Sequence, residues 1–157
     1  CDIGWPAIVV SDKGHAEGVR MRDFGDFANP ASPRNAALVE CGQHWETESI
    51  EVAKDCVTGF LRHTGVVPVD FAQERMAKRP SRLPQRVYQV SGPVTIKTDS
   101  FRFAQDWRGF EHLAKGSLIG HDGDEAVLAP HEPTVLIMPT RRLWPGKTAV
   151  RLAFPVP

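Results

Sequence analysis

The chain has 157 residues, of which 41% are apolar and 24% are charged, and its 19 Lys and Arg residues balance its 19 Asp and Glu residues. This composition is typical of a globular protein and argues against disorder, which requires low hydrophobicity and usually a high net charge. A net charge of zero excludes the basic excess that most nucleic-acid-binding proteins carry. The longest apolar stretch, residues 6–10, is far shorter than the roughly 20 residues of a membrane span, so we expect no membrane partner and no signal peptide.

The cysteines and the first residue indicate the setting of the chain. Cys1, Cys41 and Cys56 form no C-x-x-C pair, which excludes a zinc ribbon and a disulfide framework. A reduced, cytoplasmic protein is therefore expected. Because the chain begins with Cys and not Met, we expect it to be a piece of a longer protein.

The N-terminal third of the chain alternates between apolar runs and a polar loop. Residues 5–10 are β-branched and apolar, which predicts a buried strand. Residues 11–35 are polar and predict a long loop, a feature that is usually functional or disordered in compact domains. Residues 36–41 form a second apolar run, which predicts another strand that ends at Gly42.

A helix is predicted over residues 47–65. Thr47 or Ser49 can cap its N-terminus, and Gly65 can end it. Five apolar residues recur at helical period and are expected to face a core: Ile50, Ala53, Val57, Phe60 and Leu61. The order of strand, turn and helix over residues 36–65 is typical of an α/β unit at the end of an open sheet.

The pattern after residue 66 predicts a linker followed by a β domain. Three prolines and several basic residues in 67–86 indicate a linker with a solvated basic face. Residues 87–157 show short β-rich runs separated by Gly- and Pro-containing turns, one of them at residues 91–93. This pattern predicts a small β barrel or sandwich. The expected domains are thus 1–66, the end of an α/β domain; 67–86, a linker; and 87–157, a small β domain.

Glu40 is the most informative polar residue. It follows three apolar residues and lies near the end of a predicted strand, where ligand crevices of open α/β sheets are found. A carboxylate partly removed from water there would hold a proton more tightly, as a general base near neutral pH requires. The alternative is an ordinary acid at a strand end that pairs with an arginine.

Several residues near Glu40 are candidates for substrate binding. His44 and Trp45 would lie on the same rim. A loop that enters the helix explains His44 equally well, and packing on the core explains Trp45 better. Arg20, Arg22 and Arg34 could bind an anionic substrate through their guanidinium groups, or could be surface charges.

The sequence offers no compact metal-binding motif. Its six histidines form no H-x-x-E or H-x-x-x-H pattern. Asp122, Asp124 and Glu125 have the spacing of carboxylates in a calcium loop, but the rest of that pattern is missing and a tight turn between strands is expected. Cys41 is expected on the opposite strand face from Glu40, buried and inert.

Two sets of segments resemble the succinylglutamate desuccinylase/aspartoacylase family. The first is Leu38-Val39-Glu40-Cys41-Gly42-Gln43-His44-Trp45-Glu46 with the helix that follows, which is similar to the catalytic-glutamate region of that family. The second comprises residues 92–94, 110–123 and 134–139, which are similar to its C-terminal β domain. The resemblance extends from about residue 3 to residue 153.

This resemblance implies a fold and a reaction. The family has a zinc-carboxypeptidase-like α/β domain followed by a smaller β domain, and it hydrolyses the amide bond of N-acyl amino acids and related compounds. One zinc ion binds a water molecule and the substrate carbonyl, while a glutamate takes the proton of the water and passes it to the leaving amine. By match, Glu40 is this glutamate. Trp144 lies in the segment where the family contributes a residue to the pocket.

One departure from the family concerns the metal. The zinc ligands of the family, an H-x-x-E motif and a later His, lie upstream of the glutamate strand. This sequence has no H-x-x-E, and its only upstream histidine is His15. We therefore expect the C-terminal part of such an enzyme, with zinc as the implied cofactor but no zinc ligands in this chain. A homo-oligomer is left open.

Other functions compete with an enzyme fragment. Residues 87–157 could form a non-catalytic binding or interaction module. A biotinyl or lipoyl carrier would need a lysine at a hairpin tip, but residues 137–141 contain none, and Lys147 lies beyond a Pro-Gly turn.

Overall fold

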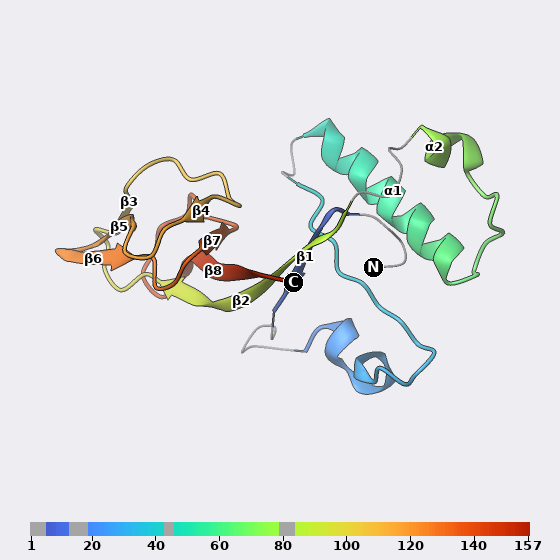
Figure 1. Cartoon of the computed structure of the whole chain (residues 1–157), viewed down its shortest axis with the longest axis horizontal. Coiled ribbons are helices and arrows are strands. Elements are labelled where there is room, and N and C mark those ends of the chain that lie inside the picture. Colours follow the sequence, from blue (N-terminus) through green and yellow to red (C-terminus); the bar gives the residue numbers. More distant parts are fainter. Residues whose placement is uncertain (1–5, 13–18, 43–45, 79–83) are drawn as a thin grey trace. The chain divides into compact units, whose positions relative to one another are not determined.

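The computed structural model describes residues 6–12, 19–42, 46–78 and 84–157. The chain divides into two compact units (Figure 1). The helical unit comprises Cys1–Ile8 and Lys13–Gln85, and the β unit comprises Val9–Asp12 and Arg86–Pro157. No helix of the described residues is long and apolar enough to cross a membrane.

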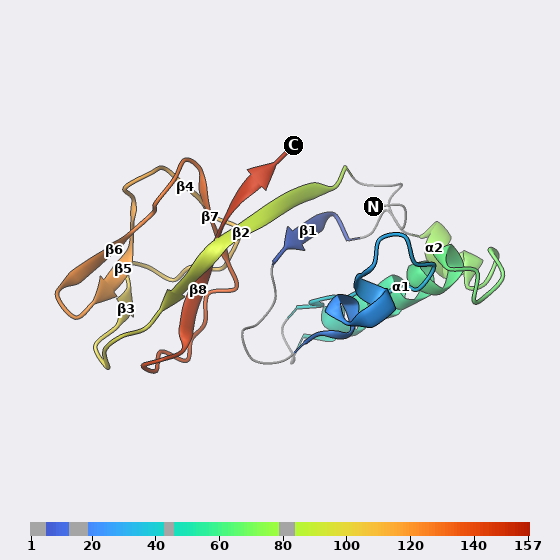
Figure 2. The ribbon, with the colours of Figure 1, turned by 90° about the horizontal axis from the view of Figure 1, so that it is seen from below.

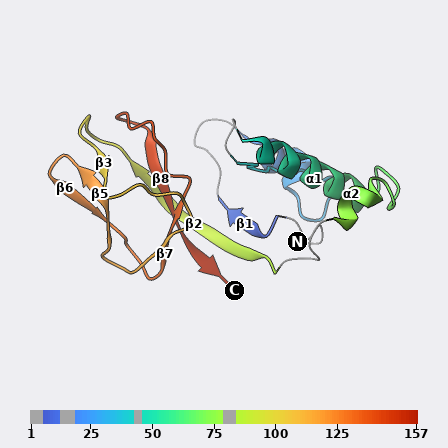
Figure 3. The same cartoon turned by 90° about the horizontal axis from the view of Figure 1, so that it is seen from above.

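The described residues of the helical unit form two α-helices and two short 3₁₀ helices. Helix α1 spans Thr47–His63 and α2 spans Gln73–Ala77, within the segment predicted to be a linker. The 3₁₀ turns η1 (Met21–Asp23) and η2 (Gly25–Ala28) lie in the long polar segment predicted to be a loop. Figure 3 shows α1 and α2 beside each other, and an Arg75–Asp55 ion pair joins them.

Helix α1 lies where the sequence predicted a helix, but the residues it buries are not the predicted ones. It begins at Thr47 with Glu46 as its N-cap residue, so neither Thr47 nor Ser49 occupies the predicted cap position, and the Glu46 side chain makes no capping hydrogen bond. The residues predicted for the core are only partly covered, because Ile50 and Val57 are exposed. Asp55, Cys56 and Thr58 are the buried residues instead.

The predicted strand over residues 36–41 is wrong. Residues 34–42 form no regular secondary structure, and Leu38 is exposed. A strand requires a neighbour with which its backbone groups can pair. Residues 19–42 and 46–78 contain no strand, so this part of the helical unit offers none.

The described strands of the β unit form two sheets. The five-stranded sheet has the order β1-β2-β8-β7-β4 and the three-stranded sheet the order β3-β5-β6. Their bounds are β1 Ile8–Ser11, β2 Arg86–Thr95, β3 Arg102–Phe103, β4 His112–Leu113, β5 Leu118–Asp122, β6 Glu125–Leu128, β7 Thr134–Ile137 and β8 Thr148–Val156. The first strand thus begins three residues later than the sequence predicted, and β4 was not predicted.

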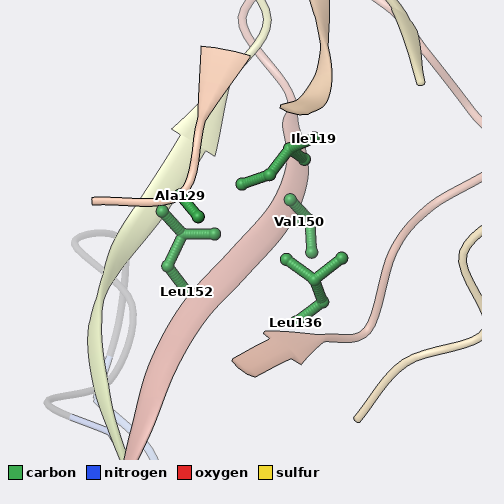
Figure 4. Close-up of a cluster of buried hydrophobic side chains, with 5 residues drawn as sticks. All are labelled: Ile119, Ala129, Leu136, Val150 and Leu152. Atoms are coloured by element: carbon green, nitrogen blue, oxygen red, sulfur yellow. The ribbon is translucent and has the colours of Figure 1, made fainter. Parts of the chain in front are cut away.

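Of the predicted alternatives, a barrel or a sandwich, the barrel is not formed. The described strands make two separate sheets with free edges, and neither sheet closes on itself. Both sheets contribute to one core, in which Ile119 of β5 packs with Leu136 of β7 and Val150 and Leu152 of β8 (Figure 4). Side chains alternate between the two faces of each strand. Two sheets that pack face to face bury the apolar face of each without forming a closed barrel.

The predicted turn at residues 91–93 is also wrong, because β2 runs without interruption through it (Figure 2). Gly92 and Pro93 pair with Leu152 and Arg151 of β8, and the register shifts between Val90 and Gly92. Such an irregularity accommodates Gly and Pro within a strand, because one residue leaves the regular ladder.

The acidic segment at residues 122–125 is a tight turn, as the sequence predicted. Asp122 pairs with Glu125 across a two-residue connection, and Gly123 adopts a φ of +63° that favours glycine. The buried carboxylate of Asp122 accepts hydrogen bonds from the Thr98 hydroxyl at 2.7 Å and from the amides of Lys97 at 2.7 Å and Thr98 at 2.9 Å. It therefore anchors the segment after β2 to this hairpin.

We expect Asp122→Asn to destabilise the β unit in a pH-dependent way. The hydrogen bond from Thr98, opposed by burial and aided by the two amides, holds the pKa of Asp122 below its ordinary value. The ionised carboxylate therefore stabilises the fold above the unfolded pKa of about 3.9, and this contribution is lost as pH falls through the folded pKa.

At pH 7 the substitution should lower the midpoint of thermal unfolding by roughly 5–10 °C, and the difference from the unmodified chain should shrink below about pH 4. The control is Asp124→Asn, which changes an exposed acid in the same turn and should have little effect. An equal loss for both variants would contradict the assigned role of Asp122.

Candidate functional site

Glu40 lies in an extended segment of the helical unit and is exposed to solvent. The expectation of a partly desolvated carboxylate at a strand end is therefore wrong for this chain. Its neighbour Cys41 is half-buried, so the expected burial of its thiol is found only in part. The carboxylate of Glu40 is open to water and to a small molecule, which is the access that a proton-transfer group requires.

The segment that carries Glu40 is held close to the start of α1. Gly42 has a φ of +119°, a conformation that side chains other than glycine rarely adopt. A Cβ atom at this position would lie 2.9 Å from the Ser49 hydroxyl of α1. Gly42 therefore permits both the turn and the close approach that direct residues 38–41 toward the helix.

The three candidate arginines lie in the segment of η1 and η2, and each is paired with an aspartate. Arg20 and Arg22 contact Asp23, the latter through its Nε atom at 3.4 Å, and Arg34 contacts Asp26 at 2.8 Å. The hydrogen bond from Arg20 holds the pKa of Asp23 below its ordinary value. An anionic ligand would have to compete with these carboxylates, although such exposed pairs are weak.

The other two candidates do not belong to the described part of the helical unit. Trp144 is exposed in the connection between β7 and β8 of the β unit, whereas Glu40 and the arginines belong to the helical unit. His44, together with Trp45, lies outside the described residues. Within the described part of the helical unit, the structure therefore brings Arg20 and Arg22 together at Asp23 and pairs Arg34 with Asp26.

Sequence reasoning missed an ionic cluster between the two helices. Asp55 is 1% exposed and contacts Arg75 of α2 at 2.7 Å, while Arg75 also donates hydrogen bonds to the backbone oxygen and the carboxylate of Glu51. The hydrogen bond to Glu51 raises the pKa of Arg75. Glu51 and Asp55 are four residues apart and so share a helix face, a spacing that could have indicated a basic partner.

The described residues do not fit a zinc ion. Across residues 6–12, 19–42, 46–78 and 84–157, no three His, Cys, Asp or Glu side chains gather in a way that could hold a metal. A zinc site needs at least three such ligands around one point. No step of a reaction in this chain can therefore be assigned to a metal held by these residues.

The chain was compared with protein-family models and with curated proteins. No protein-family model matches the chain. Curated succinylglutamate desuccinylases from strains of Vibrio cholerae serotype O1 are 32% identical over 75 residues, which is 45% of this chain and 22% of the relative. The chain thus spans about a fifth of the length of the curated relatives it matches.

Two solved structures are similar to the chain in part. A succinylglutamate desuccinylase from Vibrio parahaemolyticus matches with a TM-score of 0.51 and 19% identity, over 69% of this chain and 30% of that chain. A second, from Vibrio cholerae, has a TM-score of 0.46 and 23% identity, over 72% of this chain and 30% of that chain. The first of these similarities supports a shared fold.

These matches place the chain among relatives of deacylases. More narrowly, it is related to the succinylglutamate desuccinylases and corresponds to the C-terminal part of that family. The resemblance noted in the sequence is thereby confirmed.

Proposed function

We propose that the chain is the C-terminal portion of a hydrolase that cleaves the amide bond of N-acyl amino acids, with Glu40 as general base. The sequence identity with succinylglutamate desuccinylases carries this proposal. The names of these relatives identify N-succinylglutamate as the first substrate to test. A small-molecule substrate also fits a chain with no net charge.

In the proposed reaction Glu40 must be accessible to the substrate and must take part in two proton transfers. Its exposed carboxylate would take a proton from the attacking water, whose oxygen forms the new bond to the acyl carbon. As the carbon–nitrogen bond breaks, the same carboxyl group would return the proton to the leaving amine. The products from N-succinylglutamate would be succinate and glutamate.

Substrate binding is assigned to cationic and aromatic side chains. Both ends of N-succinylglutamate carry carboxylates, for which guanidinium groups are suitable partners. We assign this role to Arg20, Arg22 and Arg34, each of which would exchange an aspartate for the substrate. His44 and Trp144 remain further candidates for contacts with the substrate.

Zinc, which the family resemblance implies, would have to be bound by residues other than those described. The described residues gather no set of metal ligands. The ligands for such an ion would therefore have to come from residues outside the described ranges. The described residues would thus contribute to catalysis without binding the zinc ion.

A non-catalytic interaction module is the second candidate. The observation that favours it is the independent core of the β unit, which includes Ile119, Leu136 and Val150 at 0% exposure. A unit with its own core could fold and bind a partner without the catalytic residues.

The assay that separates the two candidates uses the product of the longest open reading frame that contains this chain. We expect that product to release succinate from N-succinylglutamate when it is purified with zinc. A parallel reaction after treatment with a chelator should lose the activity. A folded, zinc-supplemented product that releases no amine from N-succinylglutamate or N-acetylaspartate would overturn the proposal and favour the interaction module.

A further inference from the structure

Ser91 is the extra residue of a β-bulge in β2. In the register of β2 against β8, Val90 and Gly92 pair with consecutive residues of β8, so Ser91 between them has no partner in that ladder. A bulge changes the direction of a side chain, and bulges are common beside active sites. Ser91 is exposed, and a Cβ atom at Gly92 would meet no heavy atom within 4 Å beyond its chain neighbours. The Ser91 hydroxyl is therefore accessible to a small molecule.

The Ser91 hydroxyl meets an imidazole from a distant part of the chain. Its Oγ atom lies 3.0 Å from Nε2 of His131, which belongs to the connection between β6 and β7. The backbone oxygen of Leu152 in β8 competes for the same hydroxyl hydrogen at 3.1 Å. A serine hydroxyl is a weak nucleophile until an adjacent base can take its proton. Whether Nε2 is such a base depends on which ring nitrogen carries the hydrogen.

The tautomer of His131 follows from the partners of its other ring nitrogen, Nδ1. This atom lies 3.1 Å from the backbone oxygen of Pro133, which can only accept a hydrogen bond. It also lies 3.2 Å from Oγ1 of Thr134, whose own hydrogen is donated to the backbone oxygen of His131 at 2.7 Å. Both partners therefore require Nδ1 to carry the hydrogen. In the neutral ring, Nε2 is then the unprotonated nitrogen, and it faces Ser91.

Packing holds the His131 ring in this orientation. The ring is half-buried and meets Phe154 of β8 edge-on, with centroids 5.5 Å apart and an interplanar angle of 87°. The fully buried Thr134 accepts a hydrogen bond from the backbone amide of His131 at 3.2 Å. The arrangement thus has a nucleophile, a base and groups that orient the base, which are the parts by which a histidine activates a hydroxyl.

We propose that Ser91 and His131 form a nucleophile–base pair that accepts acyl groups from activated carboxylic esters. Ser91 Oγ attacks the carbonyl carbon and forms a new carbon–oxygen bond, while its proton passes to His131 Nε2. As the bond to the leaving oxygen breaks, Nε2 returns the proton to that oxygen. Water then hydrolyses the acyl-serine ester, which releases the carboxylic acid and restores the serine.

This activity is distinct from the proposed amide hydrolysis. The pair belongs to the β unit, whereas Glu40 belongs to the helical unit. The serine itself supplies the attacking oxygen, so the reaction requires no metal-activated water. Aryl esters are the class to test first, because a phenoxide leaves more readily than an amine.

The first experiment treats the full chain with a fluorophosphonate probe, which forms a phosphorus–oxygen bond to an activated serine and releases fluoride. Peptide mass spectrometry should find the adduct on Ser91 and none on Ser100. Ser100 is a matched control within the same molecule, because it is also exposed but its hydroxyl lies 3.1 Å from the Thr98 hydroxyl instead of an imidazole.

The second experiment measures hydrolysis of p-nitrophenyl acetate above the buffer background. Ser91→Ala and His131→Ala should each lower the rate at least about 10-fold, because each removes one member of the pair. Ser100→Ala should leave the rate unchanged. Circular dichroism of each variant checks that the fold is retained.

Three results would overturn the proposal. They are the absence of an adduct on Ser91, equal labelling of Ser91 and Ser100, and undiminished labelling of Ser91 in a folded His131→Ala variant. The first two are measured on the unmodified chain, so they remain informative even if a variant fails to fold.

Discussion

Glu40→Gln is expected to lower the turnover of N-succinylglutamate by roughly 10²–10⁴-fold in the complete enzyme. Glutamine keeps the size and polarity of the side chain but cannot accept and return a proton. Because the substitution removes proton transfer and not substrate binding, kcat should fall while KM changes little. Steady-state kinetics on the product of the longest open reading frame would measure both parameters.

The control for this experiment is Glu48→Gln, which neutralises an exposed acid in the first turn of α1. Its activity should stay within about twofold of the unmodified enzyme, and the zinc content should be the same in both variants. Activity of Glu40→Gln near that of the control would show that Glu40 is not the base. A loss of zinc from that variant would give Glu40 a metal-binding role in place of the proposed one.

Leu136→Ala is expected to cost about 2–5 kcal/mol of stability in the β unit. Leu136 is fully buried in β7, between residues from both sheets, so its truncation would leave a cavity in the shared core (Figure 4). Denaturant unfolding followed by circular dichroism would measure the change. The helical unit would be expected to retain its α-helical signal under conditions where the β unit unfolds.

Leu128→Ala provides a matched comparison, because Leu128 is 49% exposed in β6. Its cost should be below about 1 kcal/mol. Equal costs for the two leucines would mean that the two sheets do not share the core described for the β unit.

Local patterns predicted the elements whose signals lie within a few neighbouring residues. The periodicity and the glycine at position 65 predicted α1 to within two residues of its observed end. Short β-rich runs predicted that residues 87–157 are rich in strands, and the turn at Gly123 followed from its acidic, glycine-containing sequence. These features depend on backbone preferences that a short segment expresses by itself.

Features that depend on distant partners were not predicted. The apolar run at residues 36–41 has the composition of a strand, but no strand of the described helical unit lies beside it. Ser91, Gly92 and Pro93 have the composition of a turn, yet β8 pairs with this segment and makes it part of β2. In both cases the presence or absence of a pairing strand decided the conformation.

The sequence predicted some features of the candidate site and not others. The sequence around Glu40, by its similarity to a catalytic-glutamate region, identified the family that the relatives confirm. Other features of the site depend on the folded chain. These are the exposure of Glu40, the pairing of Arg34 with Asp26 and the contact between Asp55 and Arg75. The roles of Glu40 and of the arginines remain proposals that the kinetic experiments test.

The sequence by itself determined the kinship of the chain, the position of its main helix and the strand-rich character of its C-terminal half. Only the tertiary structure decided that the strands form two sheets around one core, and that α1 turns its polar side toward α2 and leaves Ile50 and Val57 exposed. The physical reason is that backbone preferences and helical periodicity are local, whereas strand pairing and burial depend on which distant parts of the chain are available as partners.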